Sequence, residues 1–63
     1  MSNQEALTVL AQVQEGFLTK SKAHFGAFIQ DGNDADRLQG NKWGACAKDL
    51  GNTIKRLEAS INN

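Results

Sequence analysis

Asp31-Gly32-Asn33-Asp34 is the clearest turn signal near the middle of the chain, and it determines how the two halves are arranged. Glycine readily adopts the left-handed conformation that ends a helix, and Asn or Asp readily caps the helix that follows. Apolar residues recur at helical spacing on both sides of this stretch. The sequence therefore predicts a helix over 3–31, a tight turn over 32–34 and a second helix over 35–61.

The first helix has a start signal and a helical apolar pattern. Ser2 and Glu5 are spaced as a capping box, in which each side chain satisfies a backbone N–H at the helix start. Gly16 and Gly26 lie inside the pattern, and each costs about 1 kcal/mol relative to Ala. The apolar positions are Leu7, Leu10, Val13, Phe17, Leu18, Phe25, Phe28 and Ile29.

The second helix has a more regular apolar stripe, with Asn33 or Asp34 as its candidate cap. Steps of four and three residues alternate along it, which is the heptad rhythm of a coiled-coil interface. Gly40-Asn41 leaves a break near residue 40 as an open alternative to one continuous helix. The stripe consists of Trp43, Ala47, Leu50, Ile54, Leu57 and Ile61.

A short turn forces the two helices to run antiparallel. Residue i then opposes roughly residue 67 minus i, and this register pairs apolar residues with apolar residues along the whole length. Val13 meets Ile54, for example, and the one mixed pair is His24 with Trp43. The sequence thus predicts an all-α antiparallel helical hairpin that forms a single domain over 1–63.

A 63-residue chain of 6.8 kDa needs further support for such a small core. Its one cysteine forms no internal disulfide, and one histidine with one cysteine is too few for a zinc site within the chain. Self-association is the remaining support, and it predicts a four-helix-bundle homodimer. The predicted hairpin and dimer core comprises Leu10, Val13, Phe17, Leu18, Trp43, Ala47, Leu50, Ile54 and Leu57.

Charge and composition exclude several classes of protein. Seven basic and seven acidic residues balance, whereas a dedicated nucleic-acid domain usually has a basic excess. No apolar run is long enough to span a membrane, and the polar opening residues do not suit a secretory signal. The unpaired Cys46 fits a reducing cytoplasm. We therefore expect a cytoplasmic protein whose partners are itself and another protein, and neither nucleic acid nor a membrane.

Cys46 and His24 are the only strong candidates for catalysis. A cysteine nucleophile needs a base within hydrogen-bond reach, a group that orients this base and an oxyanion site. The predicted register brings His24 within about one turn of Cys46 but supplies no third member and no pocket. We expect no enzyme, no cofactor and no metal.

Three surfaces remain as candidate binding sites. The small residues Gly40, Gly44, Ala47 and Gly51 share a helix face, which indicates a close crossing at a dimer interface, space for a flat ligand or an irregular helix start. A candidate basic face, either a phosphate-binding surface or a solvated exterior, consists of Lys48, Lys55 and Arg56. A candidate partner patch near the turn consists of Phe25, Phe28, Arg37, Leu38 and Lys42. The alternative is that these residues belong to the core and close the end of the bundle.

The chain resembles the small early proteins encoded between exo and xis in lambda-type bacteriophages. The resemblance covers the whole chain and rests on its length, the capped opening Ser2–Glu5, the turn at 31–34 and the stripe from Trp43 to Ile61. It implies a non-enzymatic protein of the host cytoplasm that favours early lytic development by binding host or phage proteins. The alternatives are a nucleic-acid-associated accessory factor and a sponge for a small ligand such as a cyclic nucleotide.

Overall fold

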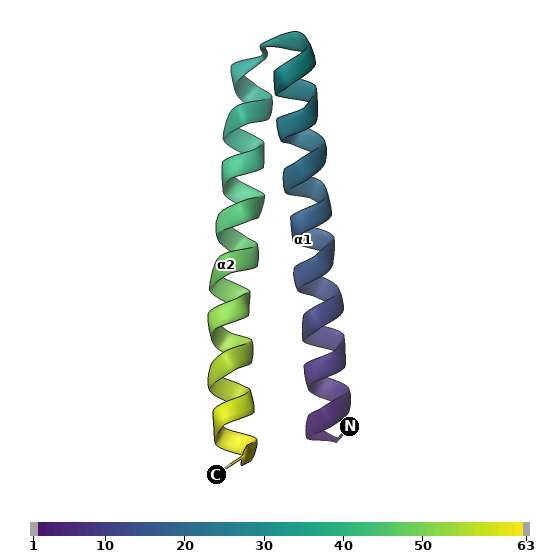
Figure 1. Cartoon of the computed structure of the whole chain (residues 1–63), viewed down its shortest axis with the longest axis vertical. Helices are drawn as coiled ribbons and strands as arrows, with labels where there is room; N and C mark the ends of the chain where they lie inside the picture. The colour runs from purple at the N-terminus through teal and green to yellow at the C-terminus, as the bar shows by residue number, and fades with distance from the viewer. Residues whose placement is uncertain (1, 63) are drawn as a thin grey trace.

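The computed structural model describes residues 2–62 and confirms the all-α antiparallel hairpin. Helix α1 covers Asn3–Asp31 and helix α2 covers Asp34–Asn62. The two helices lie side by side over their full length, and both ends of the chain are at the end opposite the turn (Figure 1). The Cα atoms extend over 47 × 16 × 12 Å, so the molecule is a rod two helices wide.

Short polar caps define the helix ends. Ser2 Oγ accepts a hydrogen bond from the Glu5 backbone N–H at 3.1 Å, which confirms Ser2 as the cap of α1. Gly32 has a φ of 66°, and its N–H donates to the Phe28 carbonyl at 2.7 Å. Asn33 Oδ1 accepts from the Ala35 N–H at 2.9 Å, so Asn33 caps α2. The turn is therefore only two residues long.

Helix α2 is continuous through Gly40 and begins at Asp34, one residue earlier than expected. The alternative with a break near residue 40 is therefore wrong. The backbone hydrogen bonds of a helix do not require a side chain, and the contact with α1 supplies the support that glycine lacks.

The predicted register is wrong by about one helical turn. It opposes Ser21 to Cys46, but Ser21 lies against Gly40 and Gly44. Likewise Trp43 stacks on Phe17, with 5.5 Å between ring centroids. Two causes account for the shift: the turn is shorter than predicted, and small residues rather than large ones form the line of closest approach.

The hairpin has almost no buried interior of its own. Ala47, at 1% exposure, is the one buried apolar residue among the described residues, and no large side chain is fully buried. Val13 and Leu18, both predicted core residues, are 43% and 44% exposed. The other predicted core residues are half-buried: Leu10, Phe17, Trp43, Leu50, Ile54 and Leu57.

Candidate interaction surface

Side chains of α1 fill the space that the small residues of α2 leave open. The Ser21 hydroxyl donates to the Gly40 carbonyl at 2.8 Å, and the Gln14 amide donates to the Ala47 carbonyl at 3.1 Å. A Cβ atom built on Gly40 would lie 3.0 Å from the ring of Phe25. The close crossing predicted at a dimer interface occurs instead between the two helices of one hairpin, because these glycines already lie against side chains of α1.

Two polar side chains at this crossing, Gln14 and Ser21, are not among the residues predicted from the apolar pattern. Gln14 and Ser21 are seven residues apart, so they share one side of α1 with the apolar positions around them. That spacing could have identified them, but their polarity removed them from a search for an apolar stripe. Each lies between two α2 residues four apart, as a knob fits a hole in a coiled coil.

His24 is engaged with Asp36 and makes no hydrogen bond with Cys46 within the described part of the chain. The Nδ1 of His24 lies 3.0 Å from Oδ1 of Asp36. Because a carboxylate only accepts, Nδ1 carries the proton in this bond. Across residues 2–62, no three His, Cys, Asp or Glu side chains come together in a way that could hold a metal ion.

One face of the hairpin, here the Trp43 face, presents aromatic and aliphatic side chains from both helices. Trp43 contacts Phe17 across the hairpin, and Lys20 Nζ lies 4.4 Å from the centroid of the indole ring. Lys42 Nζ lies 5.7 Å from the same centroid. Helical periodicity places the other members of this face beside these residues. Together the Trp43 face comprises Val13 and Phe17 of α1 and Trp43, Cys46, Leu50 and Leu57 of α2.

The opposite face, here the glycine face, combines exposed apolar residues with lysines. Leu18 and Ile29 are eleven residues apart, or three turns, so they share this side of α1. Ile29 is 83% exposed. On α2, Gly44 and Gly51 leave the backbone uncovered by side chains of their own, next to two exposed lysines seven residues apart. The glycine face comprises Leu18 and Ile29 of α1 and Gly44, Gly51, Lys48 and Lys55 of α2.

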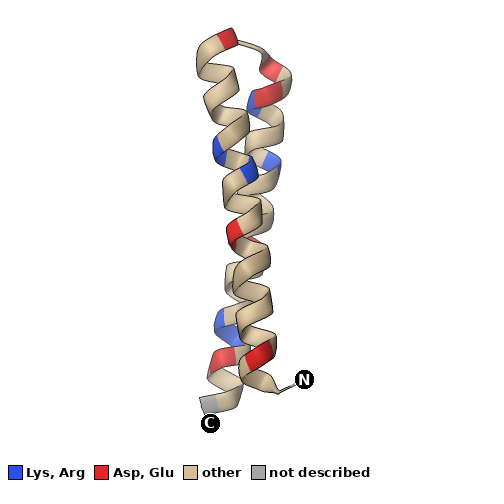
Figure 2. Ribbon diagram, turned by 90° about the vertical axis from the view of Figure 1, so that its right-hand side faces the viewer, with Lys and Arg blue, Asp and Glu red and all other residues tan. Residues whose placement is uncertain are grey.

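The candidate basic face is split by helix geometry. Lys48 and Lys55 lie on the glycine face, but Arg56, one residue further, is rotated about a quarter of a turn away from them. Acidic positions lie among the basic ones along the rod, and several are near the turn (Figure 2). The structure therefore does not gather these three residues into one cationic patch.

The candidate partner patch is also distributed over different parts of the turn end. Phe25 and Phe28 are half-buried, and Phe25 lies against Gly40. Lys42 lies near Trp43, beside the Trp43 face. Leu38 is 55% exposed.

Arg37, the remaining residue of that patch, is held by Asp34 in an exposed pair. Its Nε donates to Oδ1 of Asp34 at 2.7 Å. The hydrogen bond from Arg37, and then its positive charge, hold the pKa of Asp34 below its ordinary value. The same pair raises the pKa of Arg37.

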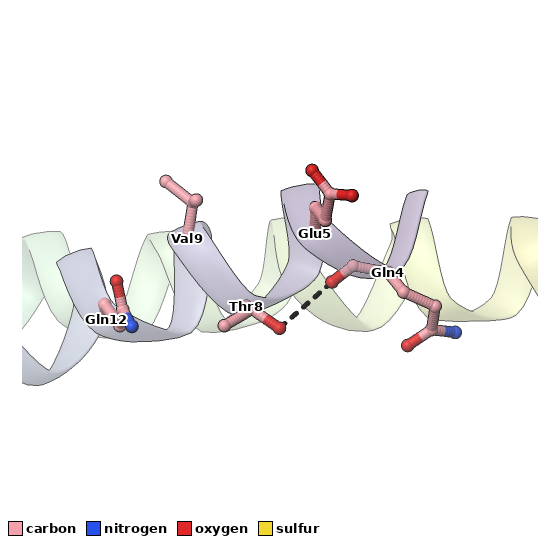
Figure 3. Close-up of a pocket in the computed structure, with 5 residues that line it drawn as sticks. All are labelled: Gln4, Glu5, Thr8, Val9 and Gln12. Atoms are coloured by element: carbon pink, nitrogen blue, oxygen red, sulfur yellow. Dashed lines mark hydrogen bonds between the residues drawn. The ribbon is translucent and has the colours of Figure 1, made fainter. Parts of the chain in front are cut away.

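A surface hollow near the start of α1 lacks a second wall. Its lining residues Gln4, Glu5, Thr8, Val9 and Gln12 all belong to the first turns of α1 (Figure 3). The Thr8 hydroxyl donates to the Gln4 carbonyl at 3.0 Å, a bond within the helix. A ligand here would contact one side of one helix, which is a poor enclosure for a small molecule.

Neither helix carries a stretch that is both long and apolar enough to cross a membrane, over the residues described. Comparison with known protein families, with curated proteins and with solved structures finds no match to this chain. The inference about function therefore rests on the surfaces of the hairpin.

Proposed function

We propose that this chain is a non-enzymatic interaction protein that works as a homodimeric four-helix bundle and binds another protein. The observation that carries the proposal is the absence of any fully buried large side chain within the described hairpin. A chain with so little interior gains its stability by burying apolar surface against something else.

The glycine face supports a protein as the outside partner. Leu18 and Ile29 are exposed on the same side of the hairpin as Lys48 and Lys55, although Ile29 lies nearer the turn, and this combination suits a surface that is both apolar and acidic. Through its resemblance to the early exo–xis proteins of lambda-type bacteriophages, the proposal extends to a cytoplasmic regulator of early lytic development. Its partner in that role is a host or phage protein.

A capture experiment with a matched pair of variants tests the proposal. We expect the tagged wild-type chain to retain a specific protein from an infected bacterial extract, and the Ile29→Asp variant to lose it. The exposed Ala23→Asp, with the same change on the outer side of α1, serves as the control. The retained protein must then bind the purified chain directly. Equal retention by wild type and Ile29→Asp would contradict a role for this face.

A nucleic-acid-associated role is the second candidate, because Lys48 and Lys55 share an exposed face. It requires binding that weakens steeply as salt rises and that is lost in a Lys48→Glu/Lys55→Glu variant. Against it stand the zero net charge and the position of Arg56 away from these lysines. The sponge for a cyclic nucleotide remains a further alternative, tested by thermal stabilisation that grows with ligand concentration.

A further inference from the structure

The described hairpin exposes more surface than a folded monomer of its mass. Its accessible surface is 4612 Å², whereas a compact monomer of 6.8 kDa exposes about 3950 Å². The excess, roughly 650 Å², is close to the ~800 Å² that each partner buries in a standard interface. The Cα radius of gyration is 14.5 Å, against about 11 Å for a globular domain of this length.

The Trp43 face is the better suited of the two faces to pair with its own copy. On α2 it presents Trp43, Cys46, Leu50 and Leu57 with no charged residue on the same side between them. The glycine face instead carries Lys48 and Lys55, whose charges would lose water against a second copy. A two-fold dimer uses the same patch on both subunits, so a patch whose charges, Lys20 and Lys42, lie only at its margin beside Trp43 pairs at lower cost.

Charge also selects the relative direction of the two hairpins. Lys20 and Lys42 both lie close to Trp43, on the side of mid-length nearer the turn. Two parallel hairpins would place four of these ammonium groups at one level of the bundle. Antiparallel hairpins place the two pairs on either side of the middle, about 10 Å apart along the rod, which weakens this repulsion.

We propose that a second copy of this chain covers the Trp43 face, with the two hairpins antiparallel about an axis near Phe17 and Cys46. Phe17 is the middle residue of α1, and Cys46 lies two residues before the middle of α2. Each therefore lies next to its own copy across the two-fold axis. This inference rests on the proposed homodimer and adds the face and the direction of pairing.

Cross-linking at the single cysteine tests the face. The reagent is a short bis-maleimide, used at a protein concentration at which light scattering gives twice the chain mass. It should join most chains through Cys46 into a covalent dimer. The matched control is Cys46→Ser/Lys48→Cys, which moves the thiol two residues along α2 to the glycine face and should stay monomeric on a denaturing gel. A second variant, Cys46→Ser/Ser60→Cys, places the thiol at the open end of the rod, where antiparallel copies lie far apart.

The possible outcomes test the choice of the Trp43 face separately from the formation of a dimer. A doubled mass with cross-linking through Cys46 alone supports the proposal. Three results at a doubled mass would contradict pairing through the Trp43 face but not the homodimer. They are cross-linking at Lys48→Cys, equal yields at Cys46 and Lys48→Cys, and no cross-linking at Cys46. Cross-linking at Ser60→Cys overturns the antiparallel direction. A mass of one chain overturns both the proposed homodimer and this inference.

Discussion

The two faces of this hairpin share one pair of helices but differ in what α2 contributes to them. On the Trp43 face, α2 supplies large apolar side chains, and a lysine flanks the indole. On the glycine face, α2 supplies glycine backbone and lysines, and the large apolar side chains Leu18 and Ile29 come from α1. The contact line between the helices passes through Ala47, and its small residues separate the two faces. One helix can therefore provide a close crossing, an apolar surface and a charged surface at the same time.

The largest expected effect is on the Trp43 face. Leu50→Asp places a charge on a half-buried position among apolar neighbours and should destabilise the protein by roughly 3 kcal/mol. Because a core of this size supplies only a few kcal/mol, most of the helical signal in circular dichroism should be lost. Lys48→Asp, two residues away on the glycine face, should remain helical. A Leu50→Asp variant as helical and as stable as Lys48→Asp would remove the distinction between the faces.

Glycine substitutions test the crossing between the faces. Gly40→Ala and Gly26→Ala gain the same helix propensity, but only the first places a methyl group 3.0 Å from the Phe25 ring. At Gly26 nothing lies within 4 Å. We expect Gly26→Ala to be the more stable of the two by about 1–3 kcal/mol in urea unfolding. Equal stabilities would show that Phe25 moves aside at no cost and that the approach of the helices is loose.

The hairpin and its ends could be predicted from the sequence because they depend on local signals. Ser2 and Gly32 act through hydrogen bonds to residues three and four positions away, and such spacing is readable directly. The register could not be predicted, because it depends on which residues allow the closest approach. Pairing large with large residues gives a register one turn too far, because it takes no account of how closely α1 approaches the backbone at Gly40 and Gly44.

In the candidate interaction surface, too, some features could be predicted from local spacing and others could not. The spacing of the apolar stripe predicts three α2 members of the Trp43 face, Trp43, Leu50 and Leu57, whereas Ala47 of the same stripe lies on the contact line between the helices. Gln14 was not found, because a polar residue that hydrogen-bonds the partner helix looks like a surface residue in sequence. The spread of the partner patch could have been found from the sequence, because helical periodicity alone points Arg37 and Leu38 about 100° apart on α2.

A smaller effect should follow from the buried hydroxyl of Ser21. Its hydrogen bond to the Gly40 carbonyl joins the two helices, and the side chain is only 7% exposed. Ser21→Ala should destabilise the protein by about 1 kcal/mol, the usual net value of such a bond. Thr19→Ala is the control, since its hydroxyl donates to Glu15 of the same helix at an exposed site. Thermal unfolding of the two variants compares them, and an equal loss would mean that the inter-helix bond adds nothing specific.

The smallest effect concerns the charge next to the glycine face at the turn. Because Arg37 holds the pKa of Asp34 below its ordinary value, the pair stabilises the folded chain above the unfolded pKa of Asp34. This contribution is lost as the pH falls through the folded pKa. Carbon NMR of the Asp34 carboxyl should show its pKa rising toward the ordinary value in Arg37→Gln, with little change in melting temperature because the pair is exposed. An unchanged Asp34 titration would mean that Arg37 is free in solution, and its charge would then join those of Lys48 and Lys55 in attracting an acidic partner to the glycine face.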